Sequence, residues 1–182
     1  MAVLGKSELL KLQKEYQVIH PFDEKLIDGD SFILTVQSPV EIKYLEHKNI
    51  ISNEIVYIPV NYVAHMTAKS KFGRLGLSFL NAAKVHSGFI GRIVLELVNL
   101  NNDRIPIVIN KGEPFMHLEI IRREGEPEPY IGEYQFQYMN DEEILMYLDI
   151  VKKTYPNYKH YVKIWLRNKP YILEKAKEIL KL

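Results

Sequence analysis

The chain has 182 residues, of which 47% are apolar and 26% are charged, and its formal net charge is +1. This composition is typical of a folded domain rather than a disordered chain, and the near-neutral charge argues against a general nucleic-acid binder. No apolar run reaches the roughly 18–20 residues that span a bilayer, and the chain has no cysteine. We therefore expect a cytoplasmic protein that binds neither membrane nor nucleic acid and has no cysteine-ligated zinc.

The first expected element is a short amphipathic helix over residues 6–16, in which leucines alternate with charged side chains and Ser7 is the candidate N-cap. The pattern then changes between Phe32 and Ile121. Short β-branched and aromatic runs are separated there by Gly, Pro and Asn, at a spacing of about ten residues that favours a β-sandwich, jelly roll or barrel over βα units.

Residues 122–138 are polar and contain proline, glycine and several aromatic residues, which predicts an extended arm rather than a core strand. A helical pattern follows over residues 141–155, with acids in the first turn and lysines in the last, and a final helix is expected near Pro170. The fold class is therefore mainly β. We expect a β domain over residues 1–138 and a helical extension over residues 139–182.

Glu96 is the candidate catalytic residue. In the run RIVLELV it shares one strand face with Val94 and Val98, and the opposite face is entirely aliphatic. A glutamate on a half-wet edge strand is the ordinary interpretation. Because both faces are otherwise apolar, we expect cover on both sides, where a carboxylate either pairs with a cation or becomes available as a general base.

The run KSKFGRLGLS supplies a second candidate site. Lys69, Ser70, Lys71 and Arg74 can bind phosphate oxygens, and the glycines allow the backbone to approach a ligand closely. The alternative is a solvated basic turn between strands. The pattern GxxxxGK[ST] is missing, so the run is not a P-loop.

The aromatic run PYIGEYQFQY leaves two interpretations open. It could form a flap that covers a nucleotide, or it could be an ordinary aromatic crossing over the sheet.

Four stretches taken together resemble the dCTP deaminase branch of the dUTPase superfamily. The stretch VLGKSELLKL with VIHPFDEKLIDGDSFILTV is similar to that family's opening helix and Pro-Phe turn. YIPVNYVAHMTAKSKFGRLGLS is similar to its strand and Arg-Ser-Ser-x-x-Arg-x-Gly-Leu loop, and NAAKVHSGFIGRIVLELVN to its Gly-Phe-x-Gly-x-Ile-x-Leu-Glu-Leu segment. PYIGEYQFQ resembles its C-terminal arm, and the four stretches occur in the family's order.

The resemblance implies a distorted jelly roll or β-barrel of the dUTPase type and a homotrimer with active sites at subunit boundaries. It also implies a substrate, dCTP, that binds with magnesium on its phosphates and is deaminated to dUTP and ammonia without zinc. The residues on the family's catalytic positions are Glu96, Ser70 and Arg74. Those on or near its substrate-binding positions are Lys69, Lys71, Ala82, Lys84, Tyr130 and Gln137.

The sequence departs from the family at several positions. His86 stands where dUTPases have the aspartate that activates water, and Phe89 stands where they have a tyrosine. Lys71 replaces a serine of the loop, and Glu133 replaces a lysine of the arm. These departures leave two alternatives open: a diphosphatase of dUTP or another dNTP, and a catalytically silent regulatory protein that binds nucleotides.

Overall fold

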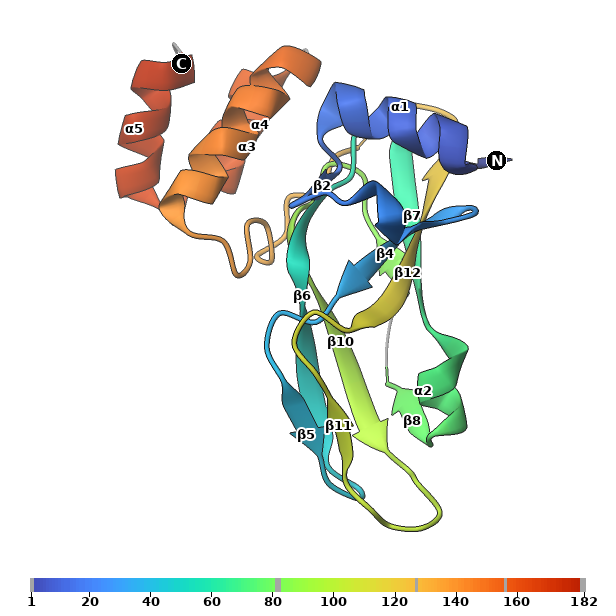
Figure 1. Cartoon of the computed structure of the whole chain (residues 1–182). Helices are drawn as coiled ribbons and strands as arrows, with labels where there is room; N and C mark the ends of the chain where they lie inside the picture. The colour runs from blue at the N-terminus through green and yellow to red at the C-terminus, as the bar shows by residue number, and fades with distance from the viewer. Residues whose placement is uncertain (1, 81–82, 127, 156, 181–182) are drawn as a thin grey trace.

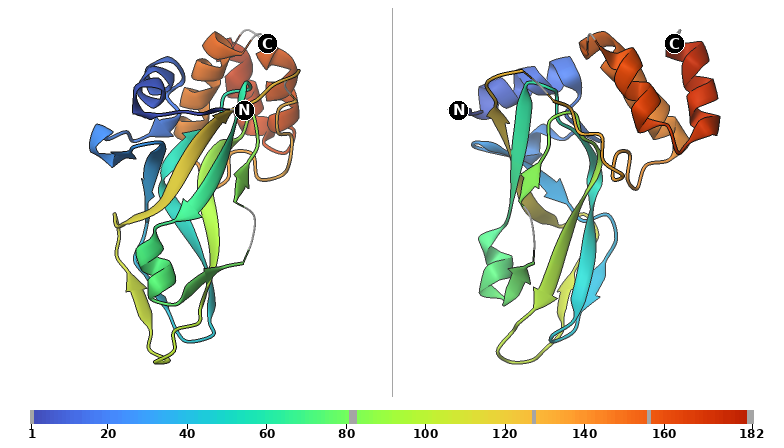
Figure 2. Two further views of the ribbon diagram at one scale, coloured as in Figure 1. Left: turned by 90° about the vertical axis from the view of Figure 1, so that its right-hand side faces the viewer. Right: turned by 180° about the vertical axis from the view of Figure 1, so that it is seen from behind.

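The computed structural model describes residues 2–80, 83–126, 128–155 and 157–180. Two antiparallel sheets pack around a shared core, and a small two-stranded sheet lies at one end of the molecule (Figure 1). A helix covers the other end, and three C-terminal helices stand together to one side of the sheets (Figures 1 and 2). The predicted fold class, mainly β with a short N-terminal helix and a helical tail, is confirmed.

The larger sheet has the strand order β3-β4-β12-β7-β9, with β1 paired to β12 on one side. The second sheet has the order β2-β6-β10-β8, and β11 pairs with β5 in the smallest sheet. None of these sheets closes into a barrel within the described residues. The strand bounds are β1 (Ala2–Val3), β2 (Ile19–His20), β3 (Ile27–Asp28), β4 (Ser31–Thr35), β5 (Val40–Ile42), β6 (His47–Tyr57), β7 (Tyr62–Ala68), β8 (Leu77–Phe79), β9 (Lys84–Val85), β10 (Ile90–Asn99), β11 (Ile107–Ile109) and β12 (Pro114–Arg122).

The helices are α1 (Lys6–Tyr16), α2 (Ser70–Arg74), α3 (Asp141–Thr154), α4 (Tyr158–Trp165) and α5 (Pro170–Leu180), with a short 3-10 turn η1 (Glu24–Leu26). No helix in the described ranges is both long enough and apolar enough to cross a membrane.

Strand β10 forms the wall on which the site is built. Its side chains alternate between a fully buried aliphatic face and a half-exposed face, as expected for a strand with one side on the core. It pairs with β6 in antiparallel register, and the register shifts between Arg92 and Val94. Such a bulge bends a strand and re-aims the side chains that follow it, here on the segment that carries Glu96.

The helical extension packs on the same sheet through a second apolar cluster. Tyr147 of α3 is fully buried, lies edge-on against Tyr57 of β6 with ring centroids 6.2 Å apart, and donates a hydrogen bond to the carbonyl oxygen of Gln17 at 3.0 Å. Burying an aromatic side chain of this size contributes on the order of 2–3 kcal/mol to stability. The extension is therefore fixed to the β-sheets along one face of α3.

Four local predictions differ from the structure. Residues 133–138 of the predicted extended arm form consecutive turns rather than extended chain. The N-cap of α1 is Gly5 and not Ser7, which lies inside the helix. The basic run after β7 contains a helical turn, α2, and is not only a loop. Helix α4 was not predicted, because its aromatic and β-branched residues have modest intrinsic helix propensity and its helical form depends on packing.

Candidate active site

A cavity of about 550 Å³ lies beside strand β10, and residues from four parts of the chain surround it. Four of the side chains singled out in the sequence line it together: Glu96, Lys84, Tyr130 and Gln137. A hollow of similar volume, about 540 Å³, lies between α1 and α3 but contains none of the predicted site residues. The other residues that line the cavity beside Glu96 are Asn49, Met66, Val85, His86, Phe89, Ile93, Val94, Tyr134 and Tyr138.

Glu96 stands in the middle of β10 and lines this cavity with its side chain half-exposed. Its direct partner across the sheet is Asn49 of β6, which lines the same cavity. The expected cover on both strand faces is wrong for the single chain, because Val94, Glu96 and Val98 form a half-exposed face. A carboxylate at a cavity wall, with an amide beside it, is placed to contact a ligand rather than to stabilise the core.

Part of the cavity lining is built from aromatic rings. Tyr130 of the arm stacks on the ring of His86 with centroids 5.7 Å apart and lies edge-on to Phe89 at 5.8 Å. The backbone N–H of Tyr130 donates to the carbonyl oxygen of Ser87 at 2.7 Å. These contacts fix the start of the arm to the segment that precedes β10.

Two glycines make room for Tyr130. A Cβ atom at Gly132 would lie 2.2 Å from the Tyr130 hydroxyl oxygen, and one at Gly88 would lie 2.7 Å from Pro129 Cβ. Gly88 also has a φ of +75°, a backbone conformation that favours glycine. A side chain at either position would therefore displace the ring from the cavity wall.

The basic residues after β7 lie outside the cavity. Lys69 pairs with Asp28 at 3.5 Å, and Lys71 forms an ion pair with Glu113 of the loop before β12. Arg74 is exposed at the end of α2. None of these cations lines the cavity, where Lys84 is the only lysine or arginine among the described residues.

Ser70 is also exposed and outside the cavity, and Ala82 lies outside the described residues. The predicted contact of Ser70 and Arg74 with Glu96 is therefore not made around the cavity of a single chain.

Three polar residues that line the cavity are not among the site residues predicted from the sequence. Asn49 could be found only from the pairing of β6 with β10, which the sequence does not specify. His86 stands at a position where the sequence departs from the family, and its ring forms part of the wall. Tyr134 belongs to the aromatic run, whose spacing alone does not distinguish rings that face the cavity from rings that face solvent.

Two histidines make stability depend on pH. Burial, with a smaller contribution from Lys84, holds the pKa of His86 below its ordinary value, and burial together with Lys69 does the same for the pKa of His117. Below about pH 6.5 the unfolded chain therefore binds more protons than the folded chain at these positions, and the free energy of unfolding falls as the pH falls. Once the pH is below the pKa values of these histidines in the folded protein, they no longer make the free energy of unfolding depend on pH.

This slope is measurable by urea unfolding between pH 7.5 and 5. The double variant His86→Gln with His117→Gln is expected to have a shallower decline over this interval than the unmodified protein. An identical decline in both proteins would show that other groups cause it.

A profile of the dCTP deaminase-like family matches residues 10–122, which is more than half of the chain. The chain belongs to the dCTP deaminase-like family. The resemblance inferred from the sequence motifs is thereby confirmed. The match ends with strand β12, so the arm and the three C-terminal helices of this dCTP deaminase-like protein lie beyond it.

Curated relatives carry the same family description. A dUMP-forming dCTP deaminase of Sulfurihydrogenibium sp. is 33% identical in an alignment of length 137 that covers 70% of this chain and 74% of that protein. A dCTP deaminase of Sulfurisphaera tokodaii is 34% identical over 97 residues, or 53% of this chain and 51% of that protein. Matches to several relatives cover only about half to two-thirds of their length.

A solved structure supports the fold of this dCTP deaminase-like protein. The 2'-deoxycytidine 5'-triphosphate deaminase from Agrobacterium tumefaciens aligns with a TM-score of 0.58 and 14% identity, over 66% of this chain and 48% of that chain. At this low identity the likeness concerns the arrangement of the strands.

Proposed function

We propose that this protein hydrolyses the amino group of dCTP and releases dUTP and ammonia. The observation that carries the proposal is the meeting of Glu96, Lys84, Tyr130 and Gln137 in one cavity. These four residues come from β9, β10 and the arm, and each was singled out independently of its position in space. Relatives named as dCTP deaminases support the same assignment.

Glu96 is the general base and general acid of the proposed reaction. Its carboxylate takes a proton from water as the water oxygen bonds to C4 of the cytosine ring, and it passes that proton to N3. The bond between C4 and the exocyclic nitrogen then breaks, ammonia leaves with the second proton of the water, and C4 becomes a carbonyl carbon. Asn49, opposite Glu96, can hold the carboxylate or the incoming water by hydrogen bonding.

We propose that a neighbouring copy of the chain completes the site, as the family resemblance implies for a homotrimer. Ser70 and Arg74 do not line the cavity of their own chain and are exposed on α2. A subunit boundary would bring them to the Glu96 cavity of the next copy, where Arg74 can stabilise the charge that develops during attack. Lys69 and Lys71 would then contact phosphate oxygens.

In the proposed reaction, magnesium is bound to the phosphates of dCTP and is part of the substrate. The described residues contain no group of three or more His, Asp or Glu side chains that could hold a metal ion. The cations of the α2 segment suit the outer phosphate oxygens. Magnesium there would neutralise part of the triphosphate charge.

A second candidate function is hydrolysis of the phosphate chain of dUTP. It rests on His86, which lines the cavity next to Tyr130 and stands where dUTPases have their aspartate. Burial holds the pKa of His86 below its ordinary value, so the ring is neutral at pH 7 and can accept a proton from water. This activity would convert the dUTP formed by deamination into dUMP.

Purified protein incubated separately with dCTP and with dUTP, each with magnesium, distinguishes these functions when the products are resolved by ion-exchange chromatography. Deamination predicts dUTP and one equivalent of ammonia from dCTP. Additional dUMP would show that the second activity is also present. Cleavage of dUTP without any deamination of dCTP would contradict the main proposal, and no reaction with either nucleotide would favour a silent binding protein.

A further inference from the structure

The arm is hydrogen-bonded along the beginning of β10. The side-chain amide of Gln135 donates to the carbonyl oxygen of Gly88 at 3.0 Å and accepts from the N–H of Ile90 at 3.2 Å. The N–H of Phe136 donates to the carbonyl oxygen of Ile90 at 2.7 Å. Because Gln135 and Phe136 are buried, these bonds are shielded from water, and contacts within the chain itself hold the arm against the sheet.

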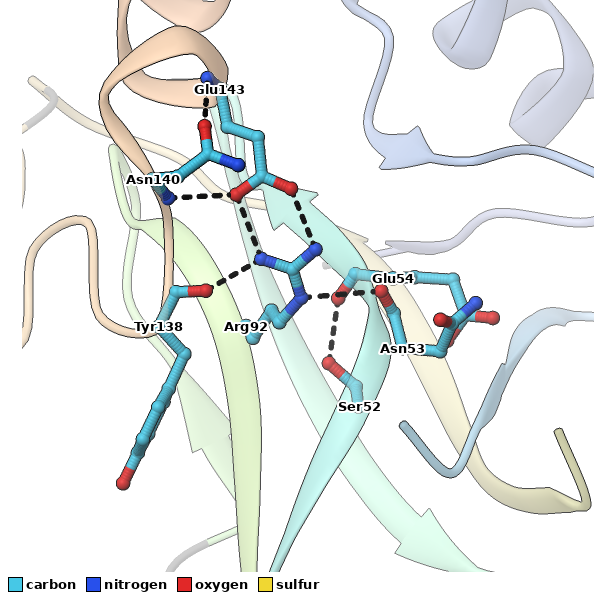
Figure 3. Close-up of polar contacts among 7 residues, drawn as sticks. All are labelled: Ser52, Asn53, Glu54, Arg92, Tyr138, Asn140 and Glu143. Carbon is cyan, nitrogen blue, oxygen red and sulfur yellow. Dashed lines mark hydrogen bonds and ion pairs between the residues drawn. The ribbon is translucent and has the colours of Figure 1, made fainter. Parts of the chain in front are cut away.

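Arg92 joins the arm to helix α3 (Figure 3). Its guanidinium donates to the carbonyl oxygen of Tyr138 at 2.6 Å and makes two hydrogen bonds to the Glu143 carboxylate, at 3.0 and 2.7 Å. The backbone N–H of Arg92 donates to the backbone carbonyl oxygen of Gln137 at 3.2 Å. In return, the side-chain amide of Gln137 donates to the backbone carbonyl oxygen of Arg92 at 2.7 Å. One residue of β10 therefore holds both the cavity-lining Gln137 and the first turn of α3.

This ion pair is well placed to be strong. The side chains of Arg92 and Glu143 are only 11% and 23% exposed, and a two-bonded guanidinium–carboxylate pair has a fixed orientation. The Arg92 hydrogen bonds also hold the pKa of Glu143 below its ordinary value. Glu143 closes the capping box of α3 with Asn140, so the start of the helix and the end of the arm share one anchor.

The arm adopts a backbone that it would not keep without such anchors. Phe136 and Tyr138 have φ values of 62° and 55°, in the left-handed region that non-glycine residues rarely occupy. Gly91 permits the close approach, because a Cβ atom there would lie 3.2 Å from the backbone nitrogen of Gln137. The contacts with β10 and α3 therefore determine the shape of the arm.

A second anchor comes from helix α4. The indole N–H of Trp165 donates to the carbonyl oxygen of Tyr130 at 2.8 Å, and its ring lies edge-on to Phe136 with centroids 6.1 Å apart. Helix α4 thus holds the arm directly at Tyr130, and α3 acts at Tyr138 indirectly, through the ion pair of Glu143 with Arg92.

We propose that helices α3 and α4 form a brace that keeps arm residues 130–138 closed over the Glu96 cavity before nucleotide binds, with Arg92 and Glu143 as positioning residues. This inference rests on the proposed function for its substrate, dCTP. A pre-ordered arm reduces the ordering that binding must otherwise supply. Loss of the brace is therefore expected to raise KM for dCTP much more than it lowers kcat.

The first test needs no nucleotide. Hydrogen exchange at the amides of Phe136 and Gln137 is expected to be at least about tenfold faster in Arg92→Met than in the unmodified protein, because the arm opens locally. Glu143→Gln is the second variant, for use if Arg92→Met folds poorly, because glutamine keeps a side-chain acceptor for the α3 cap. It is also expected to speed up exchange at these amides. The matched control, Lys153→Met, removes an exposed ion pair with Asp149 of the same helix and is expected to leave arm exchange unchanged.

The second test uses kinetics and fluorescence. Trp165 is the only tryptophan of the chain, so its emission reports on the contact between α4 and the arm. Saturating dCTP is expected to change this emission more in Arg92→Met than in the unmodified protein, because nucleotide restores the closed arm in the variant. KM for dCTP is expected to rise about tenfold with kcat within about threefold, and Arg92→Lys should recover part of the KM effect.

The outcomes separate the brace from the proposed reaction. Equal arm exchange in Arg92→Met, Glu143→Gln and Lys153→Met would overturn the brace, whatever the turnover. If the unmodified protein does not deaminate dCTP but the arm exchanges as expected, the reaction assignment fails and the brace stands. A loss of kcat with unchanged KM in Arg92→Met would also contradict a positioning role through the arm.

Discussion

Replacement of Glu96 by glutamine is expected to lower the kcat for dCTP deamination about 10³-fold, because general acid–base catalysis by a positioned carboxylate contributes on that order. The amide keeps the size of the side chain but cannot take the proton of the attacking water. Glu96 is half-exposed at the cavity wall, so the substitution is expected to leave folding intact. Binding of dCTP, measured by calorimetry, is expected to stay within a few-fold of the unmodified protein.

The matched control is Glu119→Gln. Glu119 is also a half-exposed glutamate in the middle of a strand, β12, but it does not line the cavity. Its substitution is expected to leave kcat unchanged. Undiminished turnover in Glu96→Gln, or an equal loss in both variants, would show that Glu96 does not carry the proton transfers.

Replacement of Arg74 by alanine is expected to lower kcat/KM for dCTP by about 10²–10³-fold, the effect of removing one group that stabilises developing charge. In its own chain Arg74 is exposed and outside the cavity. Such a loss therefore has a natural explanation only if a neighbouring copy brings Arg74 to the site. Steady-state kinetics with dCTP and magnesium measure the effect.

Arg104→Ala provides the comparison for this prediction. Arg104 is another exposed arginine, placed over the ring of Tyr44 at 5.6 Å, and it does not line the Glu96 cavity. Its loss is expected to leave kcat/KM unchanged. Full activity in Arg74→Ala would exclude α2 from the site.

The elements that were predicted correctly have strong local signals. Helix α3 begins with acidic residues and ends with lysines, and its observed bounds, Asp141–Thr154, differ by one residue from the prediction. The apolar alternation around Glu96 correctly identified a strand and the face on which the carboxylate lies. These features depend on neighbours within a few positions of the sequence, where periodicity is informative.

The elements that were missed depend on tertiary contacts. Asn49 reaches the site through the register of β6 with β10, and Arg92 holds α3 across 51 positions of the chain. The motif around Arg92 does not indicate this role, because its partners, Tyr138 and Glu143, lie beyond the family motifs. The cover expected over Glu96 was also wrong for one chain, because burial of a strand face depends on what packs against it.

We propose that the Glu96 cavity of one chain and the α2 cations of another form a single site. We would co-express Glu96→Gln and Arg74→Ala chains with different affinity tags and isolate the mixed oligomers by two successive purifications. In a cyclic trimer of mixed composition, one boundary in each trimer joins an intact Glu96 to an intact Arg74, so about one third of the unmodified dCTP deaminase activity is expected to return. Mixed oligomers as inactive as either variant alone would contradict a site shared between chains.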